Sequence, residues 1–471
     1  MTMKLGVQEE PAIYKVLLER ARGAALPIAD LVVSEIAQTG PNGADEFDYI
    51  DISSINNQTK RIEAPKRLPS SAAPSRARQH VRANDVLVSM TRPNLNAVAL
   101  VPSTLNGAIG STGFHVLRAN SSTEPAWLFY AVQSPQFIEA MSELVQGALY
   151  PAVRPKDIRA FSLFVPAKAA QREVVGYLDE QLSRLDASVA ALHRVQVNLK
   201  RYRASVLKSA CEGRLVPTEA ELARREGRDF ETGTQLLQRV LAERKRAWAS
   251  KRQYVEPVPV AQDELPPLPE GWAWAALDEL AWHSSYGTSA KCSPTATGTA
   301  VLRIPNVDRG NIDTTDMKYS AEALDTESTA ALKPGDMLII RTNGSKALIG
   351  RGAIVQAPFS APTTFASYLI RFRLMREVSQ EWLGLFWQSP AARRWIEARA
   401  STSAGQHNVS MSVLATAPIP VPPLAEQHRI VAEADRRLSL IRVAEAQVSA
   451  NLARAQRLRQ AILSSAFAPE I

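Results

Sequence analysis

The chain has 471 residues, 45% of them hydrophobic and 22% charged, so it can bury ordinary cores and is not broadly disordered. Its 55 lysines and arginines exceed its 47 acidic residues by 8, and its sequence pI near 9.5 favours a polyanionic partner, nucleic acid before a membrane. Without a membrane-length apolar run or a secretory signal, and with only Cys211 and Cys292, it is expected to be cytoplasmic, with neither a disulfide framework nor a zinc site.

The first 25 residues have no counterpart elsewhere in the chain. Within them, residues 9–22 have the pattern of an amphipathic helix. We predict that residues 1–25 form a helical segment, which either docks on a partner or is an ordered tail.

Two segments, residues 26–164 and 257–420, share a pattern while differing in most positions. Tyr49–Ile52 matches Val301–Ile304, and Val81–Val88 matches Leu332–Ile339. These short apolar runs are bounded by Gly, Pro, Asn and Asp, which predicts strands. Trp127-Leu128 and Trp382-Leu383 begin short helical stretches, and we predict both tryptophans to be core anchors. Each segment is therefore predicted to be an α+β domain.

A polar loop follows the second predicted strand of each domain. Arg92 and Asn94 stand in the first loop, and Arg341, Asn343 and Lys346 stand in the second. Arginine can bond guanine through two hydrogen bonds and asparagine can bond adenine in the same way, so these residues are predicted to read DNA base edges. Basic residues near both loops are candidates for phosphate contacts: Lys60, Arg61, Lys66, Arg67, Arg76, Arg78 and Arg82 in the first domain, and Arg351, Arg371, Arg373, Arg393, Arg394 and Arg399 in the second.

Polar turns at residues 147–153 and 405–409 precede the end of each domain, and we predict that each delivers a final strand into a helix. His407 lies in the second turn. Because no second His, Cys or acidic residue stands at ligand spacing, it is not expected to bind a metal.

A long helical pattern occurs twice, and the two copies align without a gap. Val165-Pro166, Gln171 and Asp179 recur 256 residues later as Val421-Pro422, Gln427 and Asp435. Apolar residues recur at spacings of four and three, which is typical of coiled-coil pairing. The predicted pairing residues are Leu182, Leu185 and Leu192 in the first copy, and Leu438, Ile441 and Leu452 in the second.

A helix of about 43 residues with one apolar stripe needs a partner. One interpretation is a parallel homodimer through either helix. The favoured one is an antiparallel pair between the two copies of one chain, since neither helix then lacks a partner. The first copy opens a central helical region and linker, residues 165–256, whose end is basic. A proline-rich spacer with Pro257, Pro259, Pro266, Pro267 and Pro269 follows it. The second copy forms the C-terminal segment, residues 421–471.

Catalytic signatures are missing from the sequence. It has no phosphate-binding Gly-x-x-x-x-Gly-Lys-Ser/Thr loop, no dinucleotide fingerprint, and no Asn/Asp-Pro-Pro-Tyr/Phe tetrapeptide typical of amino-methyltransferases. The residues thus suit DNA binding and show no means of altering DNA.

The arrangement resembles the specificity subunit of type I restriction–modification enzymes over about residues 26–471. Three segments carry the resemblance most specifically: Ala210–Pro217, Leu268–Trp272 and Pro422–Gln427. The first helical copy departs from the Pro-Leu-x-Glu-Gln pattern of Pro423–Gln427, since Ala170 stands where the second copy has Glu426, while Gln171 is kept.

The resemblance implies two target-recognition domains, each reading half of a split double-stranded DNA target, and antiparallel helices that separate them. It also implies docking of two DNA methyltransferase subunits and of motor–nuclease subunits, in a system that defends against foreign DNA. S-adenosylmethionine, ATP and magnesium are then expected on those partners, with no cofactor on this non-catalytic chain. Two alternatives stay open: a stand-alone two-domain DNA-binding regulator, and a coiled-coil scaffold protein with no DNA role.

Overall fold

The computed structural model describes residues 24–41, 45–145, 151–248, 253–261, 265–308, 310–324, 331–403 and 405–467. The chain divides into two compact units: residues 1–194 with 448–471, and residues 195–447. Of the predicted N-terminal helical segment, all but residues 24 and 25 lie outside the described residues, and these two begin a strand. No helix among the described residues is long and apolar enough to cross a membrane.

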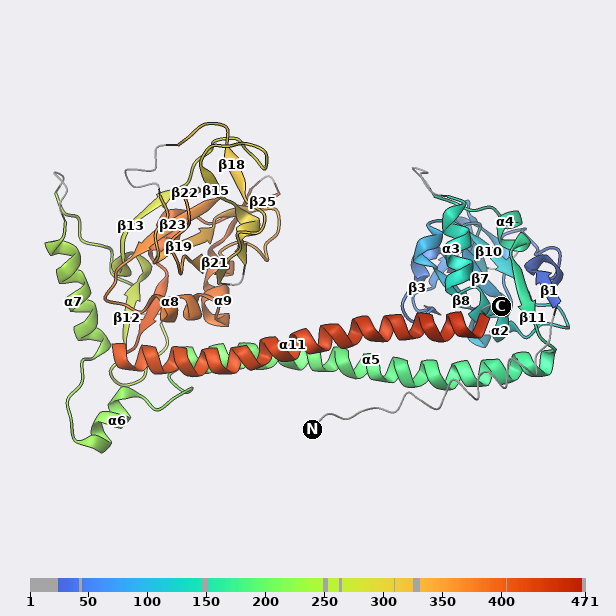
Figure 1. Cartoon of the computed structure of the whole chain (residues 1–471), viewed down its shortest axis with the longest axis horizontal. Coiled ribbons are helices and arrows are strands. Elements are labelled where there is room, and N and C mark those ends of the chain that lie inside the picture. Colours follow the sequence, from blue (N-terminus) through green and yellow to red (C-terminus); the bar gives the residue numbers. More distant parts are fainter. Residues whose placement is uncertain are drawn as a thin grey trace. The chain divides into compact units, whose positions relative to one another are not determined.

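The described part of the first unit contains two small sheets and three short helices, which can be followed in Figure 1. One sheet has the order β5-β2-β9-β6 and the other the order β10-β7-β8, with two further strand pairs, β1-β11 and β3-β4. The bounds are β1 Ala24–Pro27, β2 Glu46–Ile50, β3 Ile55–Asn56, β4 Arg61–Ile62, β5 Lys66–Pro69, β6 Ala77–His80, β7 Val86–Ser89, β8 Val98–Leu100, β9 Ile109–Ser111, β10 Phe114–Leu117, β11 Ser162–Val165, α2 Pro125–Ala131, α3 Pro135–Glu143 and α4 Pro155–Ala160.

The second unit contains sheets of order β13-β23-β19-β21, β14-β18-β15-β22 and β20-β25-β24, with two strand pairs, β12-β26 and β16-β17. Its strands are β12 Ala273–Ala276, β13 Ala281–Tyr286, β14 Cys292–Ser293, β15 Ala300–Leu302, β16 Val307–Asp308, β17 Asn311–Ile312, β18 Lys318–Ser320, β19 Asp336–Ile340, β20 Thr342–Asn343, β21 Gly352–Ile354, β22 Thr363–Phe365, β23 Leu369–Leu374, β24 Ser401–Ser403, β25 Gln406–Asn408 and β26 Pro418–Val421. Its helices are α6 Glu219–Glu226, α7 Gly233–Arg246, α8 Gln380–Trp387, α9 Pro390–Arg399 and α10 Met411–Ala415.

The two units repeat one topology. The order β10-β7-β8 recurs as β23-β19-β21, and the parallel pair β2-β9 recurs as β15-β22. The first strand of each unit pairs antiparallel with its last, β1 with β11 and β12 with β26. The expectation of two α+β domains of similar fold is thus confirmed.

Shared residues hold the central strand of each unit. Asp85 precedes β7 and accepts two hydrogen bonds from Arg118, at 2.8 and 2.7 Å. Asp336 begins β19 and accepts two from Arg373, at 2.7 and 2.8 Å. Trp127 in α2 and Trp382 in α8 are fully buried, so the prediction that both are core anchors is confirmed.

Two long helices of 44 residues each, α5 (Lys168–Cys211) and α11 (Leu424–Phe467), follow the domains. In the first unit, the start of α5 packs with the end of α11, where Leu178 and Leu182 share an apolar cluster with Leu463 and Ala466. Arg459 also donates to Asp186 at 2.6 Å.

In the second unit, the end of α5 packs with the start of α11, where Val206 and Ala210 share a cluster with Ala434, Leu438 and Ile441. A pairing of start with end in each unit is antiparallel (Figure 1). The intramolecular antiparallel pair is therefore confirmed, and the predicted pairing residues Leu182, Leu185, Leu192, Leu438, Ile441 and Leu452 are all buried or half-buried.

The three segments that carry the resemblance meet in the second unit around buried Glu426. Its carboxylate accepts from Trp272 Nε1 at 3.0 Å and from the Glu219 backbone N–H at 2.8 Å. Gly213, at φ 65°, lies so close to Pro269 that an added Cβ would stand 2.6 Å from its Cγ. The first unit has Ala170 in place of Glu426, so it has no carboxylate for such a bond.

Candidate nucleic-acid interface

The two predicted polar loops occupy equivalent places in the two units. We define the first polar loop as residues 90–97, after β7, and the second as residues 341–351, after β19. The backbone N–H of Met90 donates to the Gly113 carbonyl, and that of Arg341 donates to the Tyr368 carbonyl, both at 2.9 Å. Met90 thus corresponds to Arg341, so Arg92 corresponds to Asn343 rather than to the arginine of the second loop.

The polar turns at residues 151–153 and 405–409 also pair with these loops. The backbone N–H of Val153 donates to the Met90 carbonyl at 2.8 Å, and that of Val409 donates to the Arg341 carbonyl at 2.9 Å. A short helix, α4 or α10, lies between each turn and the final strand, so the prediction that the turn delivers this strand was wrong. The backbone of each turn instead contacts the polar loop of its unit. Residues 146–150 of the first turn lie outside the described residues.

In the first unit, Arg92 and Asn94 are both exposed. Arg92 has the left-handed backbone conformation, φ 49° and ψ 62°, and precedes a short 3-10 helix, Pro93–Leu95. The loop closes at Asn96, whose Nδ2 donates to the Val132 carbonyl at 2.9 Å. This hydrogen bond anchors the end of the loop, while Arg92 and Asn94, the predicted base-reading residues, are exposed to solvent.

Arg76 and Arg78 are also exposed, at the start of edge strand β6. The Arg76 carbonyl accepts from the Thr112 backbone N–H at 2.8 Å, and the adjacent residue, Gly113, bonds Met90 of the first polar loop. The guanidinium of Arg78 donates to the Ser75 carbonyl at 3.1 Å. The backbone thus connects these cations to the loop through residues 112 and 113.

In the second unit, Arg341 is half-buried and lies over the ring of Tyr286, with 4.8 Å from its guanidinium carbon to the ring centroid. Its Nε is buried and has no hydrogen-bond partner among the described residues. Tyr286 and Tyr368 are 46% and 55% exposed, so this arginine stands at an aromatic surface. The two tyrosines escaped the sequence analysis because each looks like an ordinary strand residue.

Asn343 and Lys346 are held differently. The Asn343 Oδ1 accepts from the Ser345 backbone N–H at 2.7 Å, which leaves its Nδ2 as donor. Lys346 is exposed, and its carbonyl accepts from Arg393 at 2.5 Å. Arg351 donates to the Ala347 carbonyl at 2.9 Å and lies 3.6 Å from Asp308, so part of its hydrogen-bonding capacity serves the loop itself.

Several basic residues proposed for phosphate contacts have other roles in the structure. Arg371 is 1% exposed and Arg373 is paired with Asp336, so assigning these two to phosphate was wrong. Lys60 donates to Asn96, and Arg393 donates to the Ile349 and Lys346 carbonyls, so both hold polar loops. The sequence could not show these roles, because every one of these partners lies at least 35 residues away.

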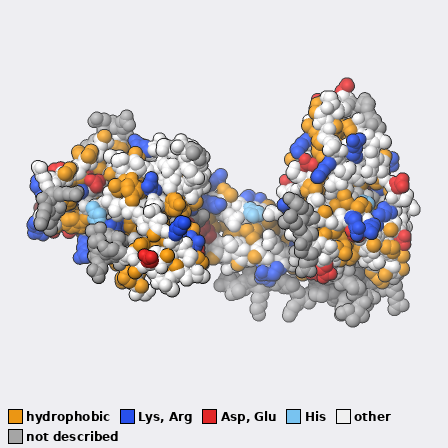
Figure 2. Space-filling view, turned by 90° about the horizontal axis from the view of Figure 1, so that it is seen from above, with side chains coloured by type: hydrophobic (Ala, Val, Ile, Leu, Met, Phe, Trp, Pro, Cys, Tyr) orange, Lys and Arg blue, Asp and Glu red, His pale blue; other side chains and the backbone are white. Residues whose placement is uncertain are grey.

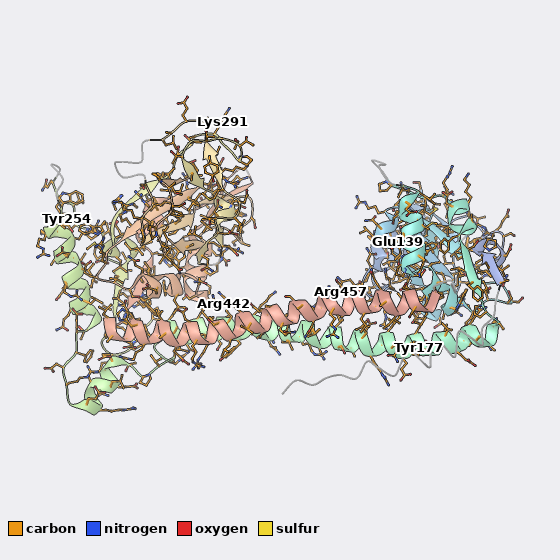
Figure 3. The ribbon with its side chains drawn as sticks, viewed as in Figure 1. Glu139, Tyr177, Tyr254, Lys291, Arg442 and Arg457 are labelled. Atoms are coloured by element: carbon orange, nitrogen blue, oxygen red, sulfur yellow. The ribbon has the colours of Figure 1, made fainter. Side chains whose placement is uncertain are left out.

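Both polar loops belong to domains whose face away from the long helices is basic. In Figure 1, α8 and α9 lie between the sheets of the second unit and α11, whereas β15, β18 and β25 lie on the far side. Figure 2 views that side and shows more Lys and Arg than Asp and Glu side chains on each unit. The exposed Lys291, labelled in Figure 3, points outward there. Among the described residues, no group of three or more His, Cys, Asp and Glu could hold a metal ion.

Comparison with known proteins shows which family the second unit resembles. Residues 269–437 match the family described as the type I restriction modification DNA specificity domain. The specificity subunit of the type I restriction enzyme EcoKI from Escherichia coli K12 is 25% identical over 356 residues, which cover 76% of this chain and 68% of that protein. The StySPI specificity subunit from Salmonella potsdam is 24% identical over 357 residues, covering 75% and 67% respectively. The chain is thus similar to type I restriction–modification specificity subunits over about three quarters of its length.

The fold of the chain agrees with that of a solved structure. A chain from a study of complex assembly and conformational transition of the type I restriction–modification system superposes with a TM-score of 0.65, covering 94% of this chain and 97% of that one at 24% identity. The family match lies within the second unit, and the first unit repeats the sheet topology of that unit.

Proposed function

We propose that the chain is a specificity subunit that recognises a bipartite double-stranded DNA target, with one half read by residues 26–164 and the other by residues 257–420. The single observation that carries the proposal is the repeat of one α+β topology with a polar loop in the same place in each copy. Two similar surfaces with different side chains suit two different half-sites, because base identity is read by side chains whereas phosphate contacts carry no sequence information.

Within each domain, we assign base reading to the exposed loop residues and phosphate contact to the cations around them. Arg92 and Asn94 serve the first domain, with Arg76 and Arg78 beside them. Arg341, Asn343 and Lys346 serve the second, with Arg351 beside them. The stacking of Arg341 on Tyr286 supports this role, because a guanidinium held flat loses less conformational freedom when it bonds a base.

The long helices are proposed as the dock for two DNA methyltransferase subunits, with motor–nuclease subunits joining to complete the restriction enzyme. Leu440 and Val443 lie three residues apart on α11 and are 62% and 70% exposed, and Tyr202 on α5 is 48% exposed. Large apolar side chains in water on a helix favour contact with another protein. S-adenosylmethionine, ATP and magnesium are assigned to those partner subunits.

Sequencing the methylated bases of a host that expresses the chain with its methyltransferase tests the proposal. We expect methylation at one motif made of two short specified sequences separated by an unspecified spacer. Methylation at a single continuous motif would contradict the proposal. Methylation that does not depend on this chain would favour the stand-alone regulator. Absence of salt-dependent DNA binding would favour the scaffold.

A further inference from the structure

The three-stranded sheet β20-β25-β24 in the second unit carries no apolar side chain. Its residues are Thr342, Asn343, Gln406, His407, Asn408, Ser401, Thr402 and Ser403, and none of them is buried. Strands are ordinarily stabilised by burying one apolar face. This sheet buries neither, so its side chains are available for a function other than packing.

The sheet is nevertheless firmly connected to the core of its unit. β20 lies two residues after β19, whose five residues are all buried. At the other end, Val409 follows β25, is 2% exposed, and bonds the Arg341 carbonyl. We call this sheet the polar ribbon. Because it is attached to a buried strand, it can hold its side chains in fixed positions.

The register places three side chains in one row across the ribbon. Asn343 pairs with His407, and His407 pairs with Thr402. Residues directly opposite each other in antiparallel strands point to the same face. The other face therefore carries a second row, made of Thr342, Asn408 and Ser401.

Hydrogen bonds orient the first row for contact with a ligand. Thr402 Oγ1 lies 3.0 Å from His407 Nδ1, which fixes the imidazole and leaves Nε2 for a further bond. Asn343 Oδ1 is used by the Ser345 backbone N–H, which leaves Nδ2 as donor. The row thus offers two nitrogen atoms, Asn343 Nδ2 and His407 Nε2, on neighbouring strands. Both residues are half-buried.

We propose that this ribbon enters the major groove of DNA and that Asn343 and His407 contact base edges there, with Thr402 as the residue that positions His407. The inference rests on the proposed function and names the element by which the second domain performs it. The antiparallel pair β24-β25 is a two-stranded ribbon, which fits the major groove, where each base pair shows a distinct pattern of donors and acceptors. The third strand, β20, places Asn343 beside this pair. Exposed Lys346 lies three residues from Asn343 and supplies a cation for a neighbouring phosphate.

Selection of duplexes from a random DNA library by the chain assembled with its methyltransferase tests this inference. Wild type is compared with H407A, N343A and T402A, and with S401A and N408A from the opposite row as matched controls. For H407A and N343A we expect discrimination to fall on the order of tenfold to a hundredfold at one or two adjacent base pairs of one half-site. T402A should affect the same base pair as H407A. The other half-site and the salt dependence should not change, since no phosphate contact is lost.

Two results would overturn the inference while leaving the proposed function intact. One is selection of the wild-type motif by H407A, N343A and T402A alike. The other is a changed motif in N408A or S401A with none in H407A. Loss of methyltransferase association in the H407A variant would show that the row binds protein and would also overturn it. If wild type selected no bipartite motif, the proposed function itself would fail.

Discussion

Gln171 and Gln427 make the same hydrogen bonds in the two units. Oε1 of Gln171 accepts from the backbone N–H of Glu124 at 2.7 Å, and Oε1 of Gln427 accepts from that of Ser379 at 3.0 Å. Nε2 donates to the carbonyl of Pro166 at 2.9 Å in one case and of Pro422 at 2.8 Å in the other. Both side chains are buried, so each ties a long helix to the start of a short helix in its own domain.

We expect Q427A to destabilise the second unit by roughly 1–3 kcal/mol, because the substitution leaves the buried Ser379 N–H without its acceptor. Q171A should have a similar effect on the first unit. Thermal unfolding of the full chain measures both. Q460A is the control. Gln460 lies at an exposed position of α11, so this substitution should leave the melting temperature unchanged. A wild-type melting temperature for Q427A would contradict this account.

The variants R92A and R341A should weaken specific DNA binding without unfolding the protein. Arg92 is exposed, and Arg341 contacts Tyr286 at the edge of its domain. Loss of a base contact should cost about 1–3 kcal/mol and relax one position of the motif. Competition binding against duplexes changed one base pair at a time measures this effect.

Y286A and Y286F separate the role of the stack from that of the arginine. Y286A should weaken discrimination at the position that R341A affects, and Y286F should restore it, because phenylalanine keeps the ring face. Wild-type affinity and discrimination in R92A and R341A would show that these arginines are solvated loop residues. A collapse of the melting temperature would show that they belong to the core of their domains.

The stability of the first unit should depend on Lys60 at alkaline pH. Burial, and secondly the charge of Arg459, lowers the pKa of Lys60 from 10.5 to about 8. Between these two values the unfolded chain binds more protons at this residue than the folded chain does, so the contribution of Lys60 to stability rises with pH. Below about pH 8 the charged ammonium opposes folding, although it donates to Asn96 Oδ1 at 3.0 Å.

Comparison of wild type with K60M therefore gives a signed prediction. As the pH rises from about 8 to about 10, the melting temperature of wild type should increase relative to that of K60M. A constant difference across this range would show that the Lys60 side chain is solvated. K66M serves as the control, because Lys66 is exposed and paired with Asp51 at 2.5 Å.

Cysteines introduced at Leu182 and Ile462 should form a crosslink within one chain. Leu182 lies in an apolar cluster of the first unit and Ile462 packs against that cluster, although 280 residues separate them in sequence. Mass spectrometry of crosslinked protein at low concentration distinguishes linkage within a chain from linkage between chains. Crosslinks found only between chains would contradict the intramolecular pairing of α5 with α11.

Periodicity in the sequence was enough to predict the repeated architecture. The apolar stripe that contains Leu182 and Leu438 predicted two long paired helices, and both were found with 44 residues each. The domains also followed from pattern, since the apolar run Val86–Val88 is short, buried and bounded by turn residues. These features depend on local sequence, so they could be predicted from it.

The polar surface was less predictable, because distant contacts decide it. Arg371 and Arg373 resemble exposed cations in the sequence, but Asp336 on a neighbouring strand holds them. The strands β24 and β25 have no alternating apolar pattern, so nothing in residues 401–408 distinguished a ribbon from a loop. The correspondence between the two polar loops needed the backbone bonds of Met90 and Arg341.

Exchange of one domain tests most directly whether each domain reads its own half of the target. Residues 268–420 are replaced by the equivalent domain of a related specificity subunit with a different target, and the methylated motif is sequenced in a host that also expresses the methyltransferase. One half of the motif should change to that of the donor while the other half is kept. A change in both halves, or in neither, would contradict independent reading by the two domains.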